Sequence, residues 1–315
     1  MVAWSLDTCV GDVHVRGTER TTWQVVRNPG GGISSCCHMH PVAAAARVTS
    51  NSKQVQVQML PRKPGFSARN GARVYLADSC TEGAYHPERY AAWPLIGKTI
   101  SVTVDLSGAE CGCNAAFYLV SMAQNRQPGN CGGDFYCDAN DVCGVRCEEI
   151  DLIEANKHAF RSTVHTAWDN GGVGEGGGGG HWAFGFDKYG PRGSIISTER
   201  PFRTHFKFVV GDREQLTGLQ TTLEQEGRSL DYWTASPQYL NKLTGALERG
   251  MTPTFSYWST EHLEWMDNPP CGRSQQDQCG QVASFSDIEV IDYRHPSPSP
   301  PPPPSPPPPP SPAPP

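Results

Sequence analysis

Alternation of polar and apolar residues is the strongest pattern along this chain. It runs through residues 54–60 (QVQVQML) and 99–106 (TISVTVDL), and alternation over five or more residues is typical of a strand with one buried face. Further segments alternate in the same way or are apolar throughout, at residues 115–122, 161–168, 203–210, 253–259 and 285–293. The pattern therefore predicts eight or more strands.

Helical periodicity is convincing in one place, residues 236–250 (SPQYLNKLTGALERG). Ser236 is a good N-cap, and Gly250 is a typical helix stop. Apolar residues recur every three or four positions between them, at Leu240, Leu243 and Leu247. Many strands and few short helices predict an all-β fold, a curved two-sheet β-sandwich of the jelly-roll, concanavalin-like kind.

Composition changes sharply near the end of the 315-residue chain. From Pro296 onward the sequence contains only Pro, Ser and one Ala, which cannot build a core and favours polyproline II. We therefore expect one domain over residues 1–295 and a linker or tail over residues 296–315. A single all-β domain of this size, with 33 glycines in the chain, is within the normal range.

Charge and hydropathy exclude two classes of partner. The net charge is −6 and the Lys and Arg residues are scattered, so the basic patch of a nucleic-acid binder is missing. No apolar run is long enough to span a bilayer, and the first residues, MVAWSLDTCVGD, do not resemble a secretory signal. A neutral or weakly polar substrate fits this surface better than an ionic one.

Twelve cysteines make an even count, which predicts up to six disulfides and an oxidising, extracellular compartment. With no signal at the start, either the N-terminus is incomplete or this compartment is wrong. Zinc is the alternative for the cluster Cys131, Cys137, Cys143 and Cys147. Their separations of six, six and four residues lack the paired CxxC spacing of structural zinc sites. We therefore expect no metal here.

Residues 147–156 (CEEIDLIEAN) place carboxylates on an apolar stretch. On a strand, Glu149 and Asp151 share one face while the aliphatic residues point into the protein. Glu154 follows Glu149 by five positions, which puts it on the wrong face of a regular strand. One bulged residue near Leu152 or Ile153 corrects the phase and leaves the two glutamates about 13 Å apart at their Cα atoms.

Two carboxyl groups about 5 to 5.5 Å apart are what a retaining glycosidase needs, one as nucleophile and one as acid/base. Asp151, between them, is expected to hydrogen-bond one glutamate and raise the pKa of the other by charge repulsion. An exposed acidic edge strand is the plainer alternative. Calcium ligation is a weaker one, because carboxylates on a strand rarely encircle an ion.

The carboxylate run resembles the Glu-x-Asp-x-x-Glu signature of glycoside hydrolase family 7, the cellulose-cleaving cellobiohydrolases and endoglucanases. Four other segments are similar to that family, at residues 100–122, 129–147, 250–267 and 283–293. The resemblance covers roughly residues 70–290 and is weak before residue 70. It departs from the family at Ile153, where Trp is common, and in the short spacing between Trp258 and Trp265.

This resemblance implies specific roles. Glu149 takes the nucleophile position and Glu154 the acid/base position, while Asp151 and His165 support them. The substrate-binding positions that it implies are Asn114, Tyr118, Trp258 and Trp265. Packing in the core is the alternative for each of these residues, and for Trp168 and Trp182, which border the glycine-rich segment 171–182, it is the preferred one.

The resemblance implies a secreted, monomeric enzyme that needs no cofactor and cleaves β-1,4-glucosidic bonds in cellulose with retention. The chain is markedly shorter than the fungal cellobiohydrolases, and the missing length falls between matched strands. An open cleft and cleavage within a glucan chain are therefore expected. The alternatives are a cellobiohydrolase acting from chain ends, a β-1,3 or mixed-linkage glucanase, a non-catalytic carbohydrate-binding protein and a structural wall protein.

Overall fold

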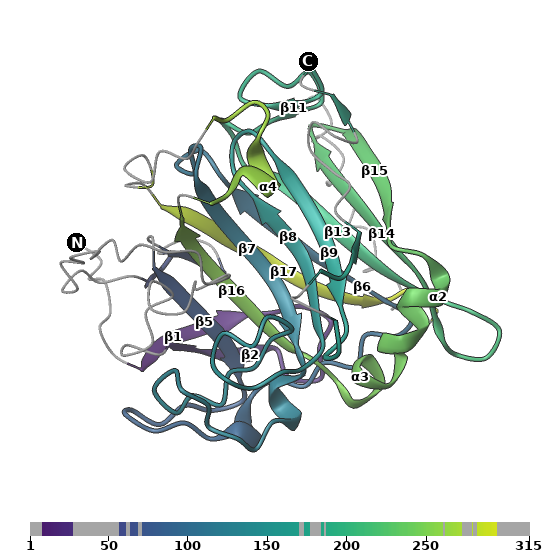
Figure 1. Ribbon diagram of the computed structural model, residues 1–315. Helices are drawn as coiled ribbons and strands as arrows, with labels where there is room; N and C mark the ends of the chain where they lie inside the picture. Colours follow the sequence, from purple (N-terminus) through teal and green to yellow (C-terminus); the bar gives the residue numbers. More distant parts are fainter. Residues whose placement is uncertain are drawn as a thin grey trace, which may run out of the picture.

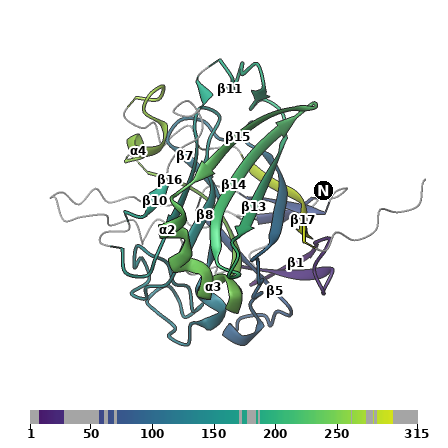
Figure 2. The same ribbon diagram turned by 90° about the vertical axis from the view of Figure 1, so that its right-hand side faces the viewer.

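The computed structural model describes residues 8–27, 57–60, 64–68, 71–169, 173–176, 184–185, 187–260, 262–272, 279 and 282–294. Within these residues two large antiparallel sheets form separate layers (Figures 1 and 2). The expected tail at 296–315, Trp182, and most of the glycine-rich segment lie outside the described residues.

The first sheet has eight strands, and the site described below is built on it. In spatial order they are β1 (Cys9–His14), β2 (Thr22–Arg27), β5 (Ala72–Ala77), β16 (Thr252–Ser259), β7 (Cys113–Val120), β8 (Glu149–Ala155), β9 (Phe160–His165) and β10 (Glu175–Gly176). Neighbours along the chain and neighbours in space differ: β16 from late in the sequence lies between β5 and β7.

The second sheet has seven strands. Their spatial order is β15 (Arg228–Thr234), β14 (Leu216–Gln225), β13 (Phe202–Val210), β6 (Lys98–Asp105), β17 (Ala283–Asp292), β4 (Gly65–Ala68) and β3 (Val57–Met59). A small parallel pair, β11 (Tyr189–Gly190) and β12 (Ile196–Ser197), stands apart from both sheets. The predicted all-β, two-sheet sandwich is confirmed.

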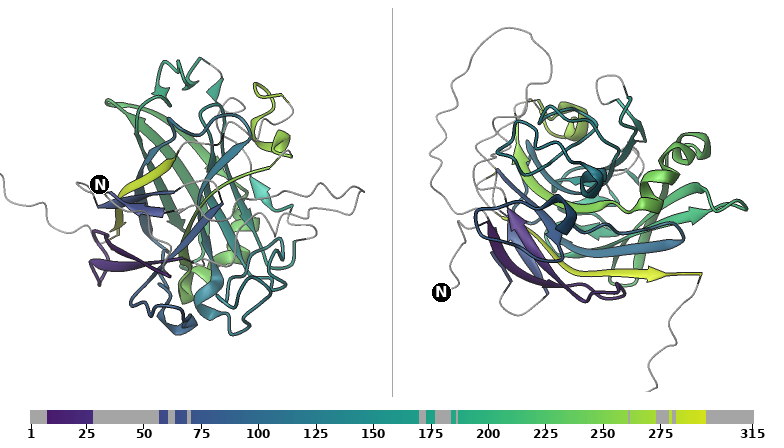
Figure 3. Two further views of the ribbon diagram at one scale, coloured as in Figure 1. Left: turned by 90° about the vertical axis from the view of Figure 1, so that its left-hand side faces the viewer. Right: turned by 90° about the horizontal axis from the view of Figure 1, so that it is seen from below.

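The main hydrophobic core lies between the two sheets. Aromatic rings join the layers: Phe117 of β7 meets Phe206 of β13 at 6.3 Å between ring centroids, and Phe66 of β4 meets Phe255 of β16 at 5.0 Å. The view from below shows the two layers stacked (Figure 3). Strand β13 alternates between buried and half-buried residues because its outer face meets solvent.

Strand β7 departs from this alternation, since all eight of its residues are buried. One face contributes Phe117 and Leu119 to the core between the sheets. The other face contributes Tyr118 and Val120 to a second cluster beneath residues 125–148, which we call the disulfide loop. This loop covers part of the face of the eight-stranded sheet that is turned away from the core.

The predicted helical segment at 236–250 is present, but a 3-10 turn breaks its α-helical geometry. It consists of α2 (Pro237–Leu240), a 3-10 turn (Asn241–Leu243) and α3 (Thr244–Arg249). The expected ends hold, because the Ser236 side chain caps Tyr239 N and Gly250 follows with φ of 91°. The expected apolar face also packs inward on β14, and the Thr244 hydroxyl accepts a hydrogen bond from Leu216 N at 3.0 Å, which ties the break to the sheet.

In the part of the chain that the structure describes, the other short helices are α4 (Glu264–Asp267) and two 3-10 turns, Pro87–Arg89 and Ser121–Gln124. Among the described residues, no helix has the length and apolar character needed to cross a membrane.

Five disulfides are present among the described residues. They join Cys9 to Cys80, Cys111 to Cys271, Cys113 to Cys279, Cys131 to Cys143, and Cys137 to Cys147. The four clustered cysteines form two of these disulfides, so the disulfide interpretation is confirmed and the zinc alternative is wrong. Cys36 and Cys37 lie outside the described residues.

Candidate active site

A β-bulge interrupts strand β8 in the middle of the carboxylate run. On the β7 side, Phe117 pairs with Ile153 but Tyr118 pairs with Asp151, so Leu152 is an extra residue without its own partner. The register with β9 also shifts between Asp151 and Glu154. The bulge predicted near Leu152 or Ile153 is confirmed.

The bulge decides which side chains share a face. Ile150, Leu152 and Ile153 are all fully buried in the core between the sheets. Two consecutive residues thus point inward, and the parity of the strand changes after them. Glu149 and Glu154 therefore both lie on the face away from the core, and the charge of Glu154 raises the pKa of Glu149.

Glu149 lies at the edge of the disulfide loop and is 6% exposed. Its Oε2 accepts a hydrogen bond from the Ala139 backbone N–H at 3.1 Å. Burial raises the pKa of Glu149 well above its ordinary value, and the charges of Asp151 and Asp138 raise it further. The Ala139 hydrogen bond acts in the opposite direction and favours the carboxylate.

Asp151 is held by His165 across the β8–β9 pair, with 3.0 Å between Asp151 Oδ2 and His165 Nε2. Both side chains are buried. Burial lowers the pKa of His165, but the hydrogen bond and charge of Asp151 outweigh it, so the pKa is raised overall. The expectation that Asp151 hydrogen-bonds a neighbouring glutamate is not met, because alternate residues on a strand are held apart while His165 approaches from the next strand.

Glu154 has different neighbours. Its Oε1 accepts a hydrogen bond from Asn114 Nδ2 at 3.2 Å, and Asn114 Oδ1 accepts one from Ala155 N, also at 3.2 Å. Burial raises the pKa of Glu154 well above its ordinary value, and Asp151 adds to the effect. Asn114 and the Arg161 guanidinium act to lower this pKa.

Both predicted tryptophans lie toward the Glu154 end of this face. Trp258, half-buried at the end of β16, pairs with Asn114 of β7. Trp265 is 42% exposed on α4, the helix whose Met266 carbonyl accepts a 3.4 Å hydrogen bond from Arg161 Nε of β9. The structure thus places the two tryptophans on elements that adjoin Asn114 and Arg161.

Comparisons with known proteins point to one family of glycoside hydrolases. The sequence profile of glycosyl hydrolase family 7 matches residues 33–143, which begins earlier than the resemblance noted above and ends before the carboxylate run. Endoglucanase EG-1 of Hypocrea jecorina is 26% identical over 294 residues, covering 79% of this chain and 61% of that protein. In sequence the chain is therefore similar to glycoside hydrolase family 7.

Solved structures of the family share its fold. Glycosynthase mutants of Humicola insolens Cel7B superpose with a TM-score of 0.63 at 17% identity, covering 89% of this chain and 96% of that one. A family 7 cellobiohydrolase from Daphnia pulex gives a TM-score of 0.55 at 18% identity, covering 74% and 80%. By sequence, the chain spans about three fifths of the length of the curated endoglucanase.

Tyr118 lies beside Asp151 on the same face, but it is 5% exposed. Its hydroxyl accepts a 3.2 Å hydrogen bond from Tyr136 OH of the disulfide loop, and burial raises its pKa. The expected core packing of Trp168 is wrong, since its side chain is 88% exposed in the turn after β9.

Sequence reasoning missed several residues that adjoin the acids. Asp138 and the Ala139 N–H approach Glu149 from the disulfide loop, and Arg161 stands opposite Glu154 on β9. The loop residues carried no periodic signal, because the Cys137–Cys147 disulfide places them. Arg161 could have been predicted from the sequence. A tight turn joins β8 to β9, so counting residues back from the turn along both strands pairs Arg161 with Glu154.

A buried ion pair supports the disulfide loop from below. Arg73 of β5 lies 3.6 Å from the centroid of the Tyr136 ring, and its guanidinium is 3.8 Å from Asp134 Oδ2. Asp134 also accepts a 2.6 Å hydrogen bond from Tyr75 OH. The side chains of the ion pair are 4% and 0% exposed, so the loop is fastened to the sheet by charges removed from solvent.

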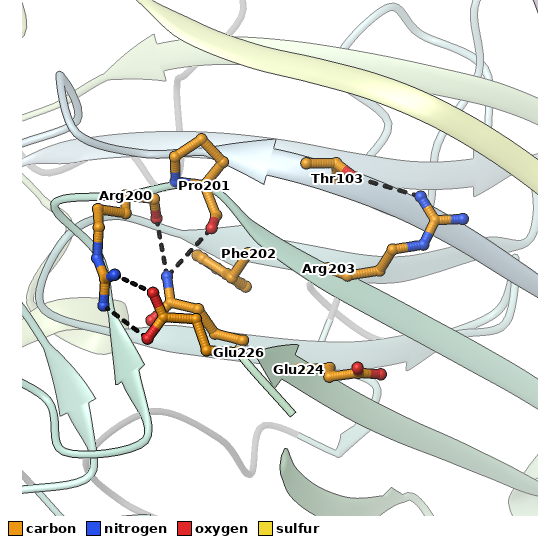
Figure 4. Close-up of a pocket in the computed structure, with 8 residues that line it drawn as sticks. Thr103, Arg200, Pro201, Phe202, Arg203, Glu224 and Glu226 are labelled. Carbon is orange, nitrogen blue, oxygen red and sulfur yellow. Dashed lines mark hydrogen bonds and ion pairs between the residues drawn. The ribbon is translucent and has the colours of Figure 1, made fainter. Parts of the chain in front are cut away.

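Two other features are separate from the acids. The hollow in Figure 4 is lined by Thr103, residues 200–203 and residues 224–226, which belong to the seven-stranded sheet and its turns. Arg203 donates a 3.2 Å hydrogen bond to Thr103 there. Elsewhere in the described chain, Cys111, His158 and Cys271 offer atoms within 4.8 Å of one another, but the two sulfurs form a disulfide and are not thiolate ligands.

Chemically, the site pairs two carboxyl groups in unlike environments. Glu149 receives a backbone N–H and is enclosed by the disulfide loop, whereas Glu154 faces an amide, a guanidinium and the region of the two tryptophans. Environments of this kind separate the roles of two acids, one as an anion and one as a proton donor.

Proposed function

We propose that this chain is a retaining glycoside hydrolase that cleaves β-1,4-glucosidic bonds within cellulose chains. The observation that carries the proposal is the bulge at Leu152, which turns Glu149 and Glu154 to one face of the sheet. The name of the Hypocrea jecorina relative, endoglucanase EG-1, supports the substrate class and the endo action.

In the first step, the Glu149 carboxylate attacks the anomeric carbon and the Glu154 carboxyl donates its proton to the leaving oxygen. In the second, Glu154 takes a proton from water, and the resulting attack releases the sugar from Glu149. Burial and Asp151 raise the pKa of Glu154, which favours the protonated form that the first step needs. The Ala139 N–H stabilises the anionic form of Glu149.

Asp151 and His165 are positioning groups in this proposal. Their 3.0 Å contact holds the Asp151 carboxylate in place between Glu149 and Glu154 along the strand. Asn114 orients Glu154. Trp265, and more weakly Trp258, would provide indole faces for the apolar faces of glucose rings. Tyr118 would act through Tyr136 and the disulfide loop, because its ring is buried.

The five disulfides favour an oxidising compartment, and we propose that the protein works outside the cell on a polysaccharide substrate. It needs no metal or organic cofactor for the two-carboxylate reaction.

The test is Glu149→Gln, with Glu148→Gln as the matched control. Glu148 is the adjacent glutamate, half-buried, and lies just before β8. We expect Glu149→Gln to lose nearly all release of reducing ends from carboxymethylcellulose while it still binds cello-oligosaccharides, and Glu148→Gln to retain turnover. A wild-type protein that binds glucan but never cleaves it would be a carbohydrate-binding protein, and the proposal would fail.

Substrate and mode of attack are tested with the wild type. Cleavage of carboxymethylcellulose but not laminarin supports β-1,4 specificity over a β-1,3 or mixed-linkage glucanase. Early loss of viscosity supports cleavage within chains. Release of cellobiose as the first product, with viscosity unchanged, would instead make the protein a cellobiohydrolase, the activity named for the Daphnia pulex structure.

A further inference from the structure

Arg161 is the cationic residue of β9 that stands opposite the proposed acid/base. It pairs directly with Glu154 in the β8–β9 register, and directly opposed residues of an antiparallel pair place their side chains on the same face. The side chain is neither fully buried nor fully exposed. The guanidinium is restrained by α4, because Arg161 Nε donates a 3.4 Å hydrogen bond to the Met266 carbonyl.

The other groups that face Glu154 come from three directions. Its own strand contributes Asp151, whose carboxylate also contacts His165 at 3.0 Å. Strand β7 contributes Asn114, which is neutral. Helix α4 carries Asp267, but this carboxylate accepts hydrogen bonds from Gly112 N and Asn156 Nδ2, at 2.9 Å each.

Glu154 thus shares its face with the carboxylates Asp151 and Glu149 and with one nearby cation, Arg161. Asp151 favours its protonated form and Arg161 its ionised form. An acid/base must be protonated in the first step of the proposed reaction and ionised in the second, so the balance between these neighbours determines the pH range in which both steps proceed.

We infer that Arg161 is a positioning residue that sets the upper pH limit of catalysis by acting on the proton of Glu154 from the neighbouring strand. The inference rests on the proposed function, since it assigns Arg161 to the same site. Loss of the cation makes Glu154 hold its proton to higher pH, so the alkaline limb of the rate profile moves upward.

The experiment compares Arg161→Gln, Arg161→Lys and the wild type in kcat and kcat/KM against pH, with cellopentaose as a neutral substrate. We expect the alkaline limb of Arg161→Gln to move up by about 0.5 to 1 pH unit, less than a fully buried ion pair would give because the side chain is partly exposed. Arg161→Lys keeps the cation and should restore most of the wild-type limb.

Arg203→Gln is the matched control. Arg203 is also partly buried and paired, to Glu289 at 3.1 Å, but it lies on the outer face of the other sheet. Its pH profile should coincide with that of the wild type. If the limb does not move in Arg161→Gln, or moves equally in Arg161→Lys or Arg203→Gln, the inference is overturned and Arg161 is a structural residue.

A second readout does not depend on activity. In protein labelled with ¹³C at glutamate carboxyl groups, the Glu154 resonance is identified by its loss in Glu154→Gln, and its titration midpoint should rise in Arg161→Gln. An unchanged midpoint overturns the inference even in an active enzyme. A wild type that is inactive on every glucan refutes the proposed function instead, and the same titration still decides whether Arg161 controls the Glu154 proton.

Discussion

The buried pair of Arg73 and Asp134 allows one prediction to be developed from the structure in detail. The change is Asp134→Ala. The Asp134 side chain is 0% exposed, lies 3.8 Å from the Arg73 guanidinium, and accepts hydrogen bonds from Tyr75 OH at 2.6 Å and from Tyr136 N at 3.2 Å. Alanine removes the charge and both acceptors and leaves the guanidinium 4% exposed beneath the disulfide loop.

Removing one member of a buried ion pair costs about 3 to 5 kcal/mol, because the remaining charge has lost its counterion and cannot reach water. The Tyr75 hydroxyl loses a hydrogen bond at the same time, which adds to this cost. A loss near the middle of this range lowers the melting temperature of a domain of this size by about 10 °C. The loop that presents Ala139 N to Glu149 is the part most directly loosened.

The measurement is urea unfolding under oxidising conditions, followed by tryptophan fluorescence and circular dichroism. Glu289→Ala is the control, because Glu289 pairs with Arg203 at 3.1 Å but both side chains are more than 20% exposed, so we expect a loss of at most about 1 kcal/mol. In the double variant Arg73→Met, Asp134→Ala, much of the lost stability should return. If Asp134→Ala loses no more than Glu289→Ala, the reasoning from burial is refuted.

Two further predictions concern the carboxylates. Glu154→Gln should slow hydrolysis of cello-oligosaccharides by about 10²- to 10⁴-fold. It should spare formation of the glycosyl intermediate from 2,4-dinitrophenyl β-cellobioside, measured as a burst of dinitrophenol, because that leaving group needs no proton. Equal losses of rate on both substrates would contradict the acid role. The folded-state pKa values of Glu149 and Glu154 are raised above the ordinary 4.5, so the native state binds more protons than the unfolded state and the free energy of unfolding should fall as pH rises above about 4.5. Denaturation measured across this range should show a flatter dependence in Glu149→Gln, Glu154→Gln, and an unchanged slope would refute the assignment.

In the carboxylate run, residue spacing alone was enough to predict the bulge. Glu149 and Glu154 are five residues apart, so on a regular strand they lie on opposite faces. They can share a face only if one residue between them is bulged, and the structure has that bulge at Leu152. Alternation in the other segments likewise anticipated the strands, because the period of two is a property of the chain itself. The helical segment at 236–250 was also predicted, but the 3-10 turn in its middle was not, and there the Thr244 hydroxyl accepts a hydrogen bond from Leu216 N of β14.

Long-range neighbours were beyond such reasoning. His165 rather than a glutamate holds Asp151, and Asp138 and Ala139 approach Glu149 from a loop. Their positions depend on strand pairing and on a disulfide, which bring together residues that no periodic pattern relates.

For this protein, the sequence by itself determined the strand content, the bulge and the face on which the acids lie, since side-chain direction along a strand follows from backbone geometry and from which residues avoid water. Only the tertiary structure decided the ionisation of those acids. Burial and the charge of Asp151 raise their pKa values, while an amide, a cation and a backbone N–H lower them. Those groups come largely from other strands and from the disulfide loop, so their effect exists only once the sheets have assembled.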